Sequence, residues 1–188
     1  MPLDLGAGLL LGLLAEFLFD RPVGLMLPFA GALLTLIPDI DFLVHLARMR
    51  TSKHAEHHRE ILHIPFLYIP TGLVACIPLG EPWLFLFASA SIVHFLHDSI
   101  GIGWGVPWLY PFTDDAYSFF YHLENNSRKP KLPRRLIYVW RRNQISNMAH
   151  TYGDENWIRS IYFKLHPYAL IELLVFAIGL TAVVLSVT

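Results

Sequence analysis

The sequence predicts an all-α fold, a polytopic membrane helical bundle. Three observations indicate this fold class. The 188-residue chain is 54% hydrophobic and 15% charged, whereas soluble domains carry about 25% charged residues. Its mean hydropathy is +0.45. Its apolar residues gather in five long stretches, which short polar or proline-containing segments separate.

The five apolar stretches are expected to be helices that form two hairpins followed by a C-terminal span. Glycine recurs in the first two stretches, which would let their helices approach closely. A helix that crosses a bilayer core needs about 20 apolar residues, and only the last stretch reaches that length comfortably. The stretches are Leu3–Phe19, Pro22–Ile37, Leu62–Leu79, Trp83–Ile100 and Tyr168–Val187.

By its length the chain is expected to be one membrane-embedded domain of residues 1–188. Residues 1–115 form its core, residues 116–167 a basic and aromatic surface segment, and residues 168–187 the C-terminal transmembrane helix. Within the basic segment, Leu132–Met148 is expected to be an amphipathic helix at the membrane surface. The N-terminus lacks the pattern of a cleaved signal peptide.

The distribution of basic residues predicts the sidedness of the bundle. All Lys and Arg except Arg21 fall in residues 38–61 and 101–167, which the two hairpins place on one face of the membrane. The positive-inside rule puts that face in the cytoplasm. The expected location is therefore the cell (inner) membrane, with several spans and with the polar face toward the cytoplasm.

Histidine and aspartate recur where the apolar stretches end. Neutral imidazole and carboxylate are ligands of zinc and of other divalent ions. Ionisable groups beside apolar membrane helices are costly and usually functional. The only cysteine, Cys76, excludes a zinc site built on several cysteines. The candidate metal ligands are Asp39, Asp41, His58, His63, His94 and Asp98, with Asp4, His54 and His97 as weaker candidates.

The spacing of these residues supports a shared site without requiring it. His94 and Asp98 are four residues apart, so they share one face of a helix. Asp39 and Asp41 point the same way in an extended segment. Two alternatives stay open: one of these aspartates caps a following helix, and a histidine near a helix end binds backbone or lipid headgroups.

The segment around His58 supplies candidates for catalysis. His58 and His63 are not at helical spacing, so a bend between them is needed if both bind one metal. Arg59 can bind a phosphate oxygen. Glu60 can act as a ligand or as a general base, and Asp41 is a further candidate to accept a proton from water.

Other hydrolase motifs are absent from the sequence. It contains no His-Glu-x-x-His, which disfavours a zincin protease. It also lacks a glycine-rich phosphate loop and the Gly-x-Ser-x-Gly elbow of α/β-hydrolases. A metal on His and Asp therefore stays the favoured chemistry.

Four short motifs in a fixed order resemble a known family. They are Pro38-Asp39-Ile40-Asp41, His58-Arg59-x-x-x-His63, His94-x-x-x-Asp98 and Gly105-Val106-Pro107-x-x-x-Pro111. With them the chain resembles, over residues 1–115, the bacterial and archaeal membrane-bound metal-dependent hydrolases, which are distantly similar to zinc-dependent phospholipase C and zinc-dependent nucleases. The resemblance implies an α-helical phosphohydrolase in which the six candidate residues bind metal, with zinc expected and manganese as the alternative.

The chain departs from that family's pattern in two places. Many members read His-Arg-Gly-x-Thr-His-Ser, where this chain has Glu60, Leu62 and Ile64. Many also carry a histidine before the first helix, where this chain has Asp4. The first change affects the substrate or adds a ligand, and the second weakens the case for a site with three metals.

The expected function is metal-dependent hydrolysis of a phosphate ester in a lipid or lipid-linked substrate, with metal-activated water. The alternative is a non-catalytic membrane protein that binds a divalent metal, and a purely structural role for His and Asp is the third possibility. Membrane lipid is the expected partner of the basic segment Arg128–Arg142. No nucleic acid partner is expected.

Overall fold

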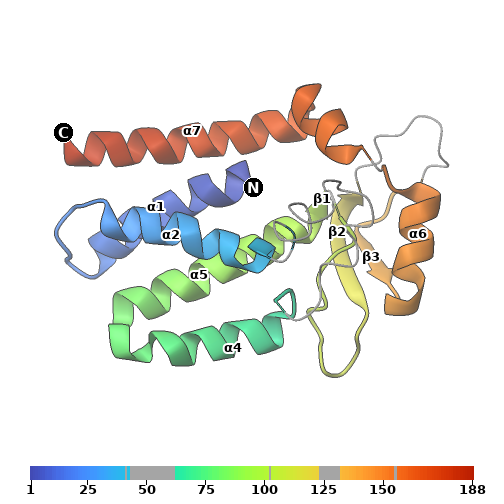
Figure 1. The fold of residues 1–188 in the computed structure, drawn as a ribbon, viewed down its shortest axis with the longest axis horizontal. Helices are drawn as coiled ribbons and strands as arrows, with labels where there is room; N and C mark the ends of the chain where they lie inside the picture. The colour runs from blue at the N-terminus through green and yellow to red at the C-terminus, as the bar shows by residue number, and fades with distance from the viewer. Residues whose placement is uncertain (41, 43–61, 102, 123–131, 155) are drawn as a thin grey trace. The chain divides into compact units, whose positions relative to one another are not determined.

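The computed structural model describes residues 1–40, 42, 62–101, 103–122, 132–154 and 156–188. Its contacts divide the chain into two compact units (Figure 1). Unit 1 comprises Met1–Pro38, Ile69–His94 and Pro167–Thr188, and unit 2 comprises Asp39–Tyr68 and Phe95–His166. The division does not test the expectation of one membrane-embedded domain, which stays a prediction.

Helices dominate the described residues, and a small sheet accompanies them (Figure 1). The α-helices are α1 (Pro2–Leu18), α2 (Met26–Leu36), α4 (Pro65–Cys76), α5 (Glu81–Asp98), α6 (Ile145–Tyr152) and α7 (Pro167–Val187). Short 3₁₀ turns cover Ile37–Asp39, Ile77–Leu79 and Arg142–Gln144, and a π-helical turn covers Arg159–Phe163. The strands are β1 (Ile100–Gly101), β2 (Ala116–His122) and β3 (Ile137–Trp140).

Unit 1 is a set of closely packed helices. Leu9, Ala32 and Val183, from α1, α2 and α7, form one buried cluster. A Cβ atom on Gly8 would overlap the backbone of Gly31, so these two glycines let α1 and α2 approach at backbone distance. The predicted role of glycine in this helix pair is confirmed at these positions.

The prediction of a polytopic bundle is wrong. Within the described residues, one helix, α7, is long and apolar enough to cross a membrane, with a mean hydropathy of 2.5 in its best window. Helices α2 and α4 have 11 and 12 residues, well short of the ~20 that a bilayer core requires. The prediction failed because it counted apolar stretches without requiring each one to reach the length of a span.

The all-α expectation is also wrong, because unit 2 contains a three-stranded sheet in the order β1-β2-β3. Strand β1 is parallel to β2, and β2 is antiparallel to β3. The predicted amphipathic helix over Leu132–Met148 is replaced by β3 and the start of α6. The sequence Ile137-Tyr138-Val139-Trp140 consists of β-branched and aromatic residues, which favour a pleated, half-buried strand.

One face of this sheet carries the core of unit 2. Ala116, Tyr138 and Trp140 are buried there, with Ile145 and Met148 of α6 packed against them. Trp140 Nε1 donates a hydrogen bond to Ser118 Oγ at 2.9 Å. Helix α6 therefore covers this face (Figure 1).

Hydrogen bonds connect the sheet to the C-terminal end of α5. The Phe119 amide donates to the Ser99 carbonyl at 2.6 Å, and Trp108 Nε1 donates to Ser99 Oγ at 2.8 Å. Val106 forms a β-bridge with Tyr117. Gly105 has a φ of +77°, and a Cβ there would overlap Tyr117. The Gly-Val-Pro motif thus has a structural role beside the end of α5.

Candidate metal centre

Three predicted ligands meet in unit 2. His63 Nε2 lies 3.3 Å from Asp98 Oδ2 and 3.7 Å from Asp39 Oδ1. His63 is fully buried, and most of each aspartate side chain is covered. Two carboxylate oxygens therefore converge on one imidazole nitrogen, which is the arrangement expected of groups that share one cation.

Local sequence signals position these three side chains. Pro38 lies within the 3₁₀ turn Ile37–Asp39 that follows α2, so Asp39 stands where the helix has ended. His63 immediately precedes α4, which begins at Pro65, a residue suited to the first turn of a helix. Asp98 is the last residue of α5. Each of these three candidate ligands thus lies at or next to the end of a helix.

His94 joins this group through helix α5. The helix runs unbroken from Glu81 to Asp98, so His94 lies one turn before Asp98 on the same face. One ligand atom from each of Asp39, His63, His94 and Asp98 lies within 4.8 Å of the others. Metal–ligand bonds of about 2.0–2.2 Å place two ligands of one zinc ion at most about 4.4 Å apart. Small side-chain shifts would therefore let all four bind one ion.

Asp4 lies against His94 in unit 1. Its Oδ1 is 3.6 Å from His94 Nδ1, and both side chains are fully buried. Thr35 Oγ1 donates a hydrogen bond to the Asp4 carbonyl at 2.9 Å, which helps to fix the first turn of α1 beside α2. Asp4 is outside the four-residue group, and its contact instead resembles that of a carboxylate behind a ligating histidine.

The remaining predicted site residues fall into two sets. His97 is partly buried on α5 and lies outside the four-residue group. The others lie outside the described residues: Asp41, His54, His58, Arg59 and Glu60.

Sequence patterns alone did not single out Glu172. Glu172 is fully buried in α7. Its Oε2 lies 3.5 Å from the Met1 amino group, which is 2.8 Å from Asp4 Oδ2. An acidic residue inside an otherwise apolar helix was the signal that could have singled it out.

Comparison with known proteins identifies one family. The family model for the YdjM inner membrane protein matches residues 4–185, a range that includes all four residues of the group. No curated protein and no solved structure matches the chain. The inner-membrane location agrees with the span expected of α7, whereas the family description does not name a metal or a hydrolase activity. The chain is an inner-membrane protein and belongs to the YdjM inner membrane protein family.

Proposed function

We propose that the protein is a metal-dependent hydrolase of phosphate esters. The observation that carries the proposal is the buried group Asp39, His63, His94 and Asp98, whose ligand atoms come from three separate segments of the chain. Carboxylates and imidazoles that converge in a buried site carry a high desolvation cost. A divalent cation bound among them would offset that cost.

The donor set fits zinc, with manganese as the alternative. Two imidazoles and two carboxylates provide the nitrogen and oxygen ligands that zinc accepts. A divalent ion supplies Lewis acidity and a source of hydroxide at neutral pH. His63, His94 and the two aspartates would hold the ion, and the partial exposure of Asp39 and Asp98 would leave a route for water and substrate.

Asp4 acts as a positioning residue for His94. Asp4 Oδ1 lies 3.6 Å from His94 Nδ1, so a small side-chain shift would let it accept a hydrogen bond from that nitrogen and leave Nε2 as the ligand atom. Loss of such a partner weakens metal affinity about 10–100-fold. Asp4 therefore serves the ion through His94.

Three further residues, proposed from the sequence alone, would act on the substrate. Arg59 would neutralise phosphate charge, and Glu60 or Asp41 would accept the proton of the attacking water. A lipid or lipid-linked ester is the proposed substrate class, because the protein resides in the inner membrane.

We place the metal group on the cytoplasmic side. Unit 2 contains three of the four ligands and the basic residues from Arg134 to Lys164. Those basic residues directly precede α7. The positive-inside rule then assigns the N-terminal end of α7 to the cytoplasm.

An activity screen tests the proposal. Detergent-purified protein is assayed on phosphomonoesters, phosphodiesters and phospholipids, with zinc, with manganese and after chelation. We expect hydrolysis of one class with metal, and we expect His63→Ala to lower the rate to that of the chelated wild type. The matched control is His150→Ala, an exposed histidine on α6, which should retain the wild-type rate.

The assay also distinguishes the alternative, a non-catalytic protein that binds a divalent metal. That alternative uses the same four ligands. Stoichiometric metal with no hydrolysis of any ester class would support it and contradict the hydrolase.

A further inference from the structure

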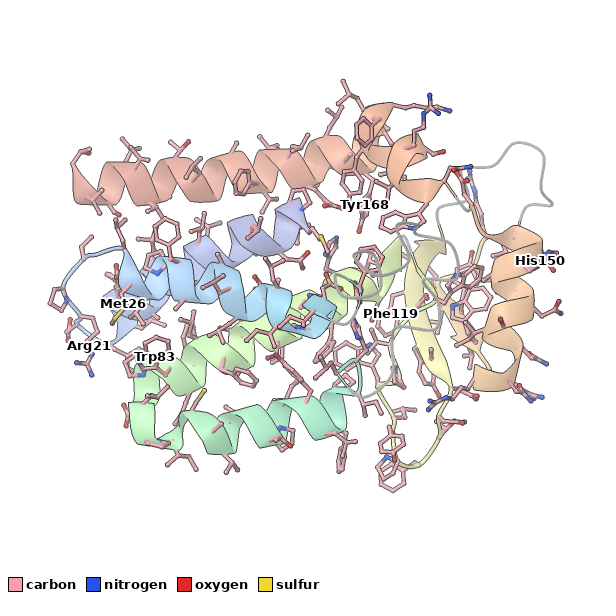
Figure 2. All side chains as sticks on the ribbon, viewed as in Figure 1. Arg21, Met26, Trp83, Phe119, His150 and Tyr168 are labelled. Atoms are coloured by element: carbon pink, nitrogen blue, oxygen red, sulfur yellow. The ribbon has the colours of Figure 1, made fainter. Side chains whose placement is uncertain are left out.

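The β2–β3 sheet of unit 2 has two faces of different character. Alternation along the strands and the antiparallel register assign each residue to a face. The inner face contains the buried residues Ala116, Ser118, Tyr138 and Trp140 and is covered by α6. The outer face consists of the register pairs Tyr117–Val139 and Phe119–Ile137. Figure 2 labels Phe119 on the sheet and His150 on α6.

The outer face is apolar although it is exposed. Ile137 and Val139 are 56% and 52% exposed, and the adjoining Leu136 and Phe120 are 75% and 60% exposed. The Phe120 amide donates a hydrogen bond to the Leu136 carbonyl, so these two residues lie beside the Phe119–Ile137 pair. Phe120 has a φ of +66°, which interrupts the alternation of β2 there. An antiparallel sheet with one face in water usually has polar residues on that face, and contiguous exposed apolar residues mark an interaction surface.

Arginines flank this surface at both ends of β3. Arg134 and Arg135 precede the strand, Arg141 and Arg142 follow it, and all four are exposed. Arg141 has an extended backbone, with φ −65° and ψ 131°, so alternation places it on the same side as Val139. Within the described part of the chain, the acidic residues that flank the two strands are Asp114 and Asp115, which precede β2. Four arginines against two aspartates leave the surface positively charged.

We propose that the outer face of the β2–β3 sheet, with its flanking arginines, docks on a lipid surface containing anionic headgroups. Apolar side chains at such a surface enter the boundary between headgroups and acyl chains, while arginines bind lipid phosphates. The protein is an inner-membrane protein, so a lipid surface is present where it resides. Exposed Ile, Val and Leu side chains disfavour nucleic acid, which would gain nothing from them. The docking requires no metal and is independent of the proposed hydrolysis.

The test measures the depth of one residue in lipid. Cys76 is buried, and burial raises the pKa of its thiol. It is nevertheless replaced in the full-length protein, as Cys76→Ser, so that a thiol-reactive fluorophore labels one introduced cysteine only. The label is placed at Val139→Cys, or at Ile137→Cys if the first variant does not fold. The matched control is Asn147→Cys, on the exposed side of α6. Each variant is placed in nanodiscs of phosphatidylcholine with and without phosphatidylglycerol.

Docking predicts a blue shift and quenching by brominated lipid at position 139, both stronger with phosphatidylglycerol, and neither at position 147. The double variant R141Q/R142Q should lose the dependence on phosphatidylglycerol. Equal, water-like emission at 139 and 147 in both lipids overturns the proposal. So does a blue shift that appears in detergent and depends on protein concentration, which indicates a second copy of the chain. A shift that requires added RNA or DNA overturns it as well.

Discussion

Buried carboxylates meet histidine in both units, but in different geometries. In unit 2, oxygens of Asp39 and Asp98 converge on the same atom, His63 Nε2, at 3.7 and 3.3 Å. In unit 1, Asp4 divides its oxygens, with Oδ1 toward His94 Nδ1 and Oδ2 toward the Met1 amino group. Convergence on one point suits ligands of an ion, whereas a carboxylate that bridges two partners suits a group that orients others. The same residue types thus meet in two different geometries.

The largest expected effect is the loss of metal-dependent stability on removing a convergent carboxylate. A ligand that binds only the folded state stabilises it by about 2.7 kcal/mol at 100 times its Kd. Zinc at that concentration should stabilise the wild type by this amount and leave Asp98→Ala unchanged. Thermal unfolding with and without zinc measures the difference. An equal gain in both proteins would show that Asp98 is not a ligand.

A smaller effect is expected from the bridging carboxylate. Asp4→Asn keeps the shape of the side chain and removes its charge, so the metal should still bind, with an affinity about 10–100-fold weaker. Zinc titration with a competing chelator gives this affinity. Glu172→Gln is the matched comparison, because Glu172 contacts the Met1 amino group, and its effect on affinity should be smaller. Complete loss of zinc from Asp4→Asn would instead make Asp4 a direct ligand.

The close packing of unit 1 should be separable from metal binding. Gly8→Ala places a methyl group against the Gly31 backbone, and overpacking of this kind costs about 1–3 kcal/mol. Gly24→Ala is the control, since the nearest atoms to its added Cβ are 3.9 Å away. Denaturation should show a loss of stability for Gly8→Ala alone. Equal losses in both variants would contradict the close approach of α1 and α2.

The smallest effect is expected inside the core of unit 2. Ser118→Ala removes the acceptor of the Trp140 indole hydrogen bond, which should cost about 0.5–1.5 kcal/mol, the net contribution of a typical hydrogen bond. Zinc affinity should stay at the wild-type value, since Ser118 is not in the four-residue group. Parallel denaturation and zinc titration test both statements. A large fall in zinc affinity would connect the sheet to the metal centre.

Local patterns in the sequence predicted part of this account. The spacing of His94 and Asp98 fixes their shared helix face, and Pro38 and Pro65 mark the helix ends where Asp39 and His63 lie. The meeting of Asp39 with His63 depends on packing between distant segments, so spacing alone could not establish it.

The errors have equally specific causes. The basic segment has a helix-like distribution of charge, but the β-branched and aromatic run Ile137–Trp140 pairs with β2 instead, because tertiary pairing outweighs weak helical periodicity. The number of spans was overestimated because short apolar helices such as α2 resemble pieces of a span in composition and differ from one in length.

The most direct test of the central claim is the metal content of purified protein. Wild type is measured beside His63→Ala, Asp98→Ala and the exposed-residue control Asp114→Ala, each supplied with zinc or manganese and each checked for folding. We predict one tightly bound divalent ion in the wild type and in the control, and its loss from both site variants. A folded wild type that retains neither metal would contradict the metal centre and leave these four side chains with a structural role.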